Sequence, residues 1–357
     1  MALDTKRLFA AALPCGLVVC AALGCSSSTA EGPTTSTGSG AAAGAAGHGT
    51  GGSGDAGAGG TGTGGTGGGA TGGAGGGSCV PTAPPVPDAC IDDVSAADLH
   101  TYSCDGLSYR VSVPAACTSC ACGLVFDVHG FTMNGAMEEH NTGLAALGRA
   151  HGYLVVQPTA PGAVPSWTAA TDDARVFAFL ERMRAAFHVD PKRIHFTGFS
   201  QGGSMTWRML CDHSDVLASV APGAFNAWED QCFTFGNAPP HVRPILYLHG
   251  TADALVAFST ATATRDAVVA AEGMVDGGVV ESDADHLWQR FVDGQGGVFE
   301  FLQHDYLGAP VLGGHCYPGS TDPGGEPGQV FSFACQPPNA FVWGQAVMQF
   351  FLDHPLP

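Results

Sequence analysis

The stretch "RIHFTGFSQGG" (193–203) decides the fold expected for this chain. A β-branched, apolar run ends at a serine, Ser200, which has glycines two residues to either side, and a helix-like segment, "GSMTWRMLC" (203–211), follows. Small neighbours let the backbone turn sharply while the serine side chain points outward, so the pattern predicts a strand, a tight turn and a helix with Ser200 at its tip as a nucleophile. The alternative is that Ser200 is a small residue in one more loop of a chain with 53 glycines.

The surrounding sequence predicts an α/β fold. Short apolar runs that end at Gly or Pro alternate with longer segments that have apolar residues at helical spacing, which indicates a mainly parallel sheet with helices on both faces. Active sites of such sheets lie at the carboxyl ends of the strands. The expected strands cover 107–114, 123–130, 153–158, 193–200, 217–225 and 244–251, and the expected helices cover 141–152, 172–187, 203–211, 260–272, 283–294 and 341–354.

A nucleophilic serine needs a base and an acid that orients the base. Asp253 follows the strand expected at 244–251, and His315 lies in "GGHCYPG" (313–319) near the end of the chain. Ser, Asp and His in this chain order are typical of α/β-hydrolases, so we expect Ser200, Asp253 and His315 to form a catalytic triad. Taken singly, Asp253 could be a turn or capping carboxylate and His315 an exposed loop imidazole. Three residues stand in reserve for these roles: His304, Asp305 and His286.

The tetrahedral oxyanion of acyl transfer requires two backbone N–H donors. One is expected from Gln201, directly after the nucleophile and at the start of a helix. The other is expected from Phe131, after the strand that ends at Gly130, with Thr132 in reserve. Gly130 also fits a plain strand-ending turn.

Four motifs in this order, "HGFTMN" (129–134), "DPKRIHFTGFSQGGSM" (190–205), "LHGTAD" (248–253) and "GGHCYPG" (313–319), resemble the esterase family that includes polyhydroxybutyrate depolymerases and feruloyl or acetyl xylan esterases. The resemblance covers about residues 104–354. It implies an α/β-hydrolase fold and a serine hydrolase that needs no metal or other cofactor. Members often carry Trp two residues after the catalytic His, where this chain has Tyr317.

Aromatic residues near the motifs suggest how a substrate is bound. Trp167 and Tyr317, with Phe131, are expected to form an apolar platform for an aryl group or a polyester chain. Packing in the core is the alternative for these side chains.

The N-terminal region is expected to direct export. Lys6 and Arg7 precede an apolar stretch that ends in small residues, as in a secretory signal over residues 1–25. "AALGC" (21–25) resembles a bacterial lipobox in which Cys25 is lipidated; ordinary signal cleavage is the alternative. Residues 26–78 consist mainly of Gly, Ala, Ser and Thr and predict a disordered linker, and 79–357 is expected to form the catalytic domain.

Charge excludes one class of partner. Asp4, Glu31 and Asp55 are among the 32 acidic residues and Lys6 and Arg7 among the 13 basic ones, which leaves 29 acidic against 11 basic residues, a net charge of −18, from residue 79 onward. Such a domain repels nucleic acid and anionic lipid, so we expect contact with a membrane only through an N-terminal anchor.

Ten cysteines lie from residue 79 onward, an even number that predicts disulfides in an exported chain. Proximity in sequence suggests Cys211 with Cys232 and Cys316 with Cys335. The cluster Cys117, Cys120 and Cys122 could instead hold a metal, but no matching Cys/His pair follows it.

These observations together predict an exported serine carboxylic ester hydrolase that acts through an acyl-enzyme. The resemblance makes a polyester or a feruloyl or acetyl polysaccharide ester the expected substrate. Two alternatives remain: a surface-tethered binding protein on a retired hydrolase scaffold, and a peptidase or thioesterase that uses the same triad. The sequence makes no prediction of oligomeric state.

Overall fold

The computed structural model describes residues 79–227, 232–233, 238–326 and 329–357. The predicted signal peptide (1–25), the linker (26–78) and the lipidation site Cys25 lie outside the described residues, and they stay predictions.

One sheet organises the described part of the chain, with the strand order β1-β2-β4-β3-β5-β6-β7-β10-β9-β8. The central strands from β4 to β10 run parallel, whereas β1, β2, β9 and β8 add antiparallel pairs at the two edges. The strands are β1 (Ala97–Cys104), β2 (Leu107–Val113), β3 (Gly123–Val128), β4 (Tyr153–Thr159), β5 (Ile194–Phe199), β6 (Ser219–Gly223), β7 (Ile245–Gly250), β8 (Val275–Ser282), β9 (His286–Val292) and β10 (Val298–His304).

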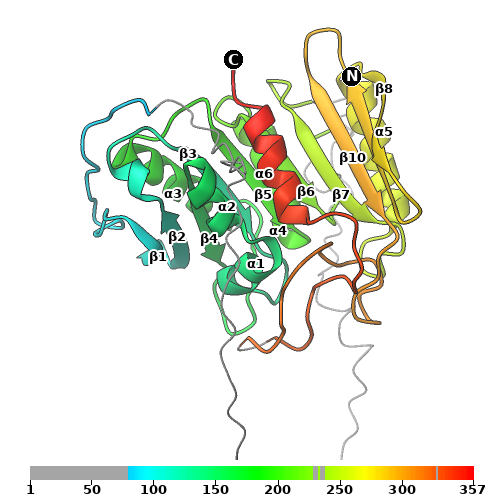
Figure 1. Cartoon of the computed structure of the whole chain (residues 1–357), viewed down its shortest axis with the longest axis horizontal. Helices are drawn as coiled ribbons and strands as arrows, with labels where there is room; N and C mark the ends of the chain where they lie inside the picture. The colour runs from blue at the N-terminus through cyan, green and yellow to red at the C-terminus, as the bar shows by residue number, and fades with distance from the viewer. Residues whose placement is uncertain (1–78, 228–231, 234–237, 327–328) are drawn as a thin grey trace, which may run out of the picture. The chain divides into compact units, whose positions relative to one another are not determined.

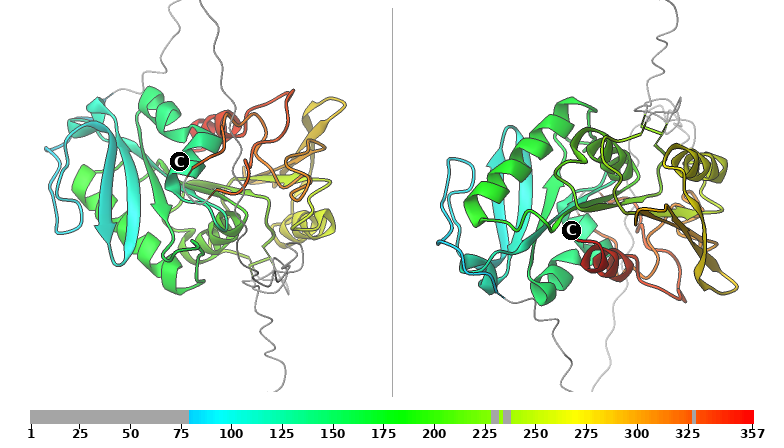
Figure 2. Two further views of the ribbon diagram at one scale, coloured as in Figure 1. Left: turned by 90° about the horizontal axis from the view of Figure 1, so that it is seen from below. Right: turned by 90° about the horizontal axis from the view of Figure 1, so that it is seen from above.

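Helices cover both faces of this sheet (Figure 1). Figure 2 shows the red helix α6 on the side of the sheet opposite the green helices α3 and α4, and α6 packs against α1 and α2. The helices are α1 (Gly135–Thr142), α2 (Leu144–His151), α3 (Thr171–Phe187), α4 (Gln201–His213), α5 (Phe258–Ala271) and α6 (Trp343–Asp353), with a 3-10 turn at Ala115–Thr118.

Two hydrophobic clusters fill the two faces because alternate residues of a strand point to opposite sides. On β3, Phe126 belongs to the cluster under α3, α4 and α5, whereas Val125 belongs to the cluster under α1, α2 and α6. The parallel strands are buried along nearly their whole length. The α/β-hydrolase fold predicted from the sequence is confirmed.

One predicted element is wrong. Residues 283–294 were expected to be helical, but His286–Val292 forms β9, which pairs with β10. Trp288 and Arg290, two residues apart on β9, both donate to the Glu300 carboxylate on β10, at 2.8 and 2.7 Å. This two-residue period belongs to a strand, and the partner that imposes it lies on another strand.

Five disulfides lie among the described residues. Cys211–Cys232 and Cys316–Cys335 are confirmed as predicted. Cys117 pairs with Cys122 and Cys120 with Cys79, so the sulfurs of the cluster considered for a metal are bonded to one another and to Cys79. The fifth bond joins Cys90 to Cys104.

In the described part of the chain, no helix combines the length and hydrophobicity that crossing a membrane requires.

Candidate active site

Ser200 lies in a strained turn between β5 and α4. Its backbone has φ 55° and ψ −117°, outside the regions that an L-residue ordinarily occupies. A hydrogen bond from its N–H to the Gly223 carbonyl at 2.9 Å holds the turn. A Cβ on Gly202 would lie 1.8 Å from the Val128 carbonyl oxygen, and one on Gly198 would lie 2.6 Å from Gly202. The turn therefore has the strained, glycine-bracketed form that exposes a nucleophile above a strand end.

Asp253 lies in the loop after β7. Its Oδ1 accepts hydrogen bonds from the backbone N–H groups of Leu255 and Val256, at 2.8 and 2.7 Å, and its side chain is fully buried. Burial raises the pKa of Asp253, but hydrogen bonds from His315 and Val256 and the nearby imidazoles lower it more, so this pKa lies below the ordinary value of 3.8. Asp253 is therefore a fixed carboxylate at neutral pH.

His315 is brought to Asp253 by the loop after β10. Its Nδ1 lies 2.7 Å from Asp253 Oδ2, and its ring meets the edge of the Phe199 ring, next to Ser200, with centroids 5.0 Å apart. With the proton on Nδ1, Nε2 is left free to accept one, which is the tautomer that a general base needs. Between the described residues Ser200 and His315 the structure has no hydrogen bond.

Backbone contacts join the loops that carry the acid and the base. The N–H of Ala254 donates to the Leu312 carbonyl at 3.1 Å, and that of Gly314 donates to the Ala252 carbonyl at 2.8 Å. A Cβ on Gly250 would lie 2.2 Å from the Gly314 carbonyl oxygen, so glycine at 250 permits this close approach.

The three residues named as alternatives for the acid and the base make other contacts. His304 is buried and stacks on Tyr306, and Asp305 accepts a hydrogen bond from the Thr251 hydroxyl. His286 faces Asp283 at 2.8 Å. The structure thus pairs Asp253 with His315 and with none of these three.

A second histidine beside Asp253 was not predicted. His249, on β7, is fully buried; its Nε2 lies 2.9 Å from the Val256 carbonyl oxygen and 3.5 Å from Asp253 Oδ2. Burial lowers the pKa of His249, so the ring is neutral and donates to Val256. It lies within "LHGTAD", a motif already singled out for its aspartate, which is the signal that could have pointed to it.

The loop expected to supply the second oxyanion donor is tightly braced. Burial lowers the pKa of His129 to about 4, and the neutral ring accepts from the Ala160 N–H at 3.0 Å while its Nδ1 lies 2.7 Å from the Gly130 carbonyl oxygen. The Thr132 N–H donates to the Pro165 carbonyl at 2.9 Å, so the alternative oxyanion donor is already engaged in a hydrogen bond. Phe131 remains the better candidate.

Gln201 begins α4, so its N–H is one of the first four amides that no carbonyl of the same helix can accept. Its side-chain Oε1 accepts from the Trp167 N–H at 3.1 Å. This contact ties the turn after β5 to the segment that precedes α3.

The two residues expected to bind substrate are buried. Trp167 is 6% exposed, and its indole N–H donates to the His129 carbonyl at 2.9 Å. Tyr317 is 0% exposed, stacks on Phe199 and donates to Glu138 at 2.6 Å. Both side chains brace loops that carry the candidate site residues, and Phe131, 38% exposed, is the aromatic of the three whose side chain is accessible.

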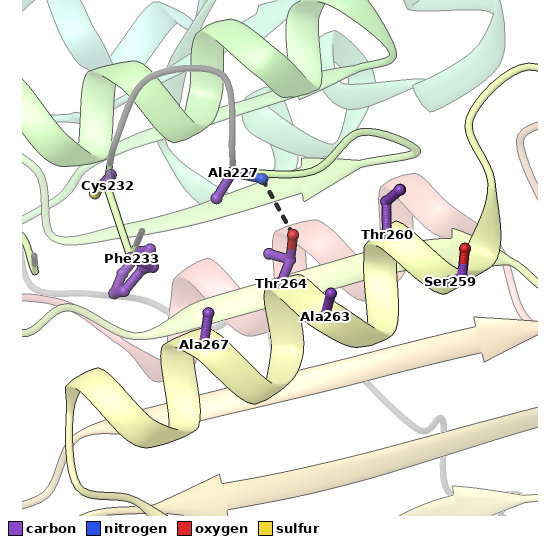
Figure 3. A pocket seen from close by; sticks show the side chains of 8 residues that line it. All are labelled: Ala227, Cys232, Phe233, Ser259, Thr260, Ala263, Thr264 and Ala267. Atoms are coloured by element: carbon purple, nitrogen blue, oxygen red, sulfur yellow. Dashed lines mark hydrogen bonds between the residues drawn. The ribbon is translucent and has the colours of Figure 1, made fainter. Parts of the chain in front are cut away.

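A separate apolar cavity of about 420 Å³ lies beside α5 (Figure 3). Residues of α5 from Ser259 to Ala267 line it, together with Ala227, Cys232 and Phe233. Its lining includes none of Ser200, Asp253 and His315, so it is distinct from the candidate catalytic site.

Comparisons with known proteins support the resemblance drawn from the motifs. The profile of the phospholipase/carboxylesterase family matches residues 175–303. The chain is 35% identical over 95 residues to feruloyl esterase B of Piromyces equi, covering 27% of this chain and 18% of that protein. It is 32% identical over 111 residues to poly(3-hydroxyalkanoate) depolymerase C of Paucimonas lemoignei, covering 28% and 27%.

A bifunctional acetylxylan esterase/xylanase of Neocallimastix patriciarum is 26% identical over 132 residues, covering 36% of this chain and 19% of that protein. These alignments thus span about a fifth to a quarter of the relatives' own lengths. Among solved structures, an acetyl xylan esterase from Aspergillus awamori superposes with a TM-score of 0.49 at 15% identity, covering 71% of this chain and 98% of that one. The sequence relatives confirm the predicted resemblance to this group of esterases.

Proposed function

We propose that this protein is a serine hydrolase that cleaves carboxylic esters through an acyl-enzyme. The observation that carries the proposal is the Asp253 to His315 hydrogen bond of 2.7 Å, held on loops that meet at the strand ends where Ser200 sits in its strained turn. In this mechanism His315 takes the proton of Ser200 as its oxygen attacks the ester carbonyl, and then gives that proton to the leaving alcohol.

The tetrahedral intermediate needs stabilisation of its negative oxygen. The N–H groups of Gln201 and Phe131 donate to that oxygen in the proposal, and the amino end of α4 favours the negative charge. Water activated by the same His315 then attacks the acyl-enzyme and releases the acid. Asp253, ionised at neutral pH, orients His315 and stabilises its protonated form.

The substrate class is proposed from the relatives. Their names include acetylxylan and feruloyl esterases and a poly(3-hydroxyalkanoate) depolymerase, all of which cleave carboxylic esters. The finer proposal is a polymer-borne ester, a polyester or an acylated polysaccharide, with the exposed Phe131 ring at the mouth of the site. Five disulfides support an oxidising, extracellular location. Lipid anchoring through Cys25 stays part of the proposal.

The test is hydrolysis of a small panel by the chain from residue 79 onward: p-nitrophenyl butyrate, methyl ferulate, acetylated xylan and a polyhydroxybutyrate suspension. We expect turnover of at least one ester and none with Ser200→Ala. A peptide anilide in the same panel separates an esterase from a peptidase. A folded protein that is inactive on every ester contradicts the proposal and favours a tethered binding protein.

A further inference from the structure

Two buried carboxyl groups lie on the strand and the helix that flank the loop carrying Phe131. Asp127, on β3, and Glu138, on α1, are 0% and 1% exposed. Asp127 Oδ2 accepts from the Thr142 hydroxyl at 2.7 Å and from the Gln157 amide at 2.9 Å. Glu138 Oε2 accepts from the Tyr317 hydroxyl at 2.6 Å. One oxygen of each carboxyl is therefore fully engaged.

The other oxygen of each carboxyl, Asp127 Oδ1 and Glu138 Oε1, is buried without a hydrogen-bond donor among the described residues, and the two carboxyls lie close enough for each to act on the pKa of the other. Two acceptor oxygens can share a hydrogen bond only if one of them carries a proton. A single proton on this pair satisfies both oxygens and avoids two like charges in a buried site.

Glu138 is the more readily protonated member of the pair. Burial raises the pKa of Asp127 to about 6 and the pKa of Glu138 well above its ordinary value. The other charged groups that act on the pair and on Tyr317 are also acids, Glu139 beside the pair and Asp322 near the tyrosine, and they oppose a second negative charge.

The pair connects the two loops that the proposed reaction requires. Asp127 lies two residues before His129, and Glu138 lies on the helix whose N-cap, Asn134, ends the loop that carries Phe131. Tyr317 lies two residues after His315. The Glu138 to Tyr317 hydrogen bond thus joins α1, which follows the loop that carries Phe131, to the loop after β10 that carries His315, here called the base loop.

We propose that protonated Glu138 and Tyr317 are a positioning pair that fixes His315 relative to the Phe131 amide, with Asp127 as the acceptor of the Glu138 proton. The inference rests on the function proposed above and adds two residues to it, neither of which touches the reacting atoms. Neutral Glu138 donates to Asp127 and accepts from Tyr317 at the same time, which a glutamine side chain can also do.

Other contacts hold the base loop from its far side, so removal of the Tyr317 hydroxyl should misplace His315 without unfolding the loop. The Tyr317 N–H donates to the Phe333 carbonyl at 2.9 Å, and the neighbouring Cys316 is bonded to Cys335. Small displacements of catalytic groups still cost much in rate.

The first test compares Tyr317→Phe with Tyr109→Phe, which removes a buried hydroxyl that donates to the Arg175 carbonyl at 3.3 Å, outside the catalytic loops. We expect Tyr317→Phe to lower kcat for p-nitrophenyl butyrate roughly tenfold with KM nearly unchanged, and Tyr109→Phe to leave both unchanged. Equal effects of the two substitutions would overturn the proposal.

The second test uses the protonation state. Glu138→Gln should keep kcat near that of the wild type at pH 7, whereas Glu138→Ala should lose activity as Tyr317→Phe does. At alkaline pH the wild type should lose kcat as Glu138 ionises beside ionised Asp127, and Glu138→Gln should lack that decline. Superimposable pH profiles of the wild type and Glu138→Gln would contradict a proton held on Glu138.

Labelling by a fluorophosphonate probe separates this inference from the proposed function, because the probe reports on an activated serine without a known substrate. Wild type that labels, with Tyr317→Phe labelling several times more slowly, supports both. Equal labelling of these two proteins overturns the positioning pair alone. Wild type that does not label overturns the proposed function.

Discussion

At the scale of single residues, the turn at Ser200 depends on atoms that glycine leaves out. Ser200 is held at φ 55° because α4 starts immediately and packs its first turn against β3, with Gly202 in contact with the Val128 carbonyl. No side chain fits at 202 unless β3 or α4 moves. The backbone of Ser200 therefore cannot relax to an unstrained conformation without moving β3 or α4.

Gly202→Ala is expected to destabilise the fold and abolish activity, because the new Cβ would lie 1.8 Å from the Val128 carbonyl oxygen. Overpacking of this kind costs about 1–3 kcal/mol or more. Thermal unfolding and ester hydrolysis measure the two effects. Gly294→Ala is the control, since its Cβ would meet no atom within 4 Å. Equal melting temperatures for the two variants would show that the contact at Gly202 is not tight.

Asp253→Asn tests the acid of the proposed triad. An amide at 253 favours the wrong tautomer of His315, so kcat should fall by up to about 10⁴-fold while KM changes little. Steady-state kinetics on p-nitrophenyl butyrate give the answer, and a circular dichroism spectrum checks that the variant is folded. A folded variant with wild-type kcat would remove Asp253 from the mechanism.

The sequence predicts the site residues that directly follow strand ends. It does not predict the buried residues that hold those site residues in place. Asp253 and His315 could be chosen because each follows an expected strand or motif. Asp127 and Glu138 could not, because their role depends on which side chains the fold places around them. Tyr317 was expected to meet substrate, yet its hydroxyl is committed to a residue 179 positions away in the chain.

At the scale of elements, the loop after β10 is anchored by its disulfide. Replacing Cys316 and Cys335 by serine should lower stability by about 3 kcal/mol in the chain-entropy picture and should also lower kcat, since His315 adjoins Cys316. Replacing Cys117 and Cys122, which close a loop of sequence separation 5 far along the chain from His315, should leave kcat unchanged. Unchanged stability and activity after loss of Cys316–Cys335 would show that the bond does not hold the base loop.

The end of α5 provides a stability prediction that does not depend on function. Both carboxylate oxygens of Glu272 are buried without a hydrogen-bond partner among the described residues, and burial together with Asp293 raises the pKa of Glu272 to about 7. The folded state therefore binds a proton more tightly than the unfolded state. The contribution of this bound proton to the free energy of unfolding is complete below pH 4.5 and is lost as pH rises through 7.

Glu272→Gln should match the wild type in melting temperature near pH 4.5 and exceed it at pH 8. Differential scanning fluorimetry over this range measures the difference. Asp266→Asn, at a side chain that is 69% exposed, is the control and should shift neither value. A Glu272→Gln variant that is no more stable than the wild type at pH 8 would place this carboxylate in solvent.

The accuracy of element prediction followed the strength of local signals. The buried parallel strands other than β10 were predicted because they are continuous apolar runs, and α3, α4, α5 and α6 were found within a few residues. The sequence predicts a helix at β9 because Leu287, Trp288 and Phe291 have helical spacing, and only pairing with β10 makes the segment a strand. β1, β8 and β10 were missed; β8 is exposed throughout and carries little apolar pattern.

At the scale of the whole molecule, the sheet gathers residues as far apart in the chain as Phe131 and His315. The sheet has a continuous run of parallel strands in the order β3-β5-β6-β7-β10. The loops after β3, β5, β7 and β10 therefore lie at the same end of the sheet. These loops carry Phe131, Ser200, Asp253 and His315. The net charge of −19 fits a neutral ester better than a polyanion. These features agree with the proposed function.

The most direct test of the central claim is to identify the residue that becomes acylated. The chain from residue 79 onward is treated with a fluorophosphonate, digested and analysed by mass spectrometry, beside Ser200→Ala and the exposed control Ser259→Ala. We expect one adduct, on Ser200, in the wild type and in Ser259→Ala, and none in Ser200→Ala. An adduct on another residue, or equal labelling of Ser200→Ala, would contradict it.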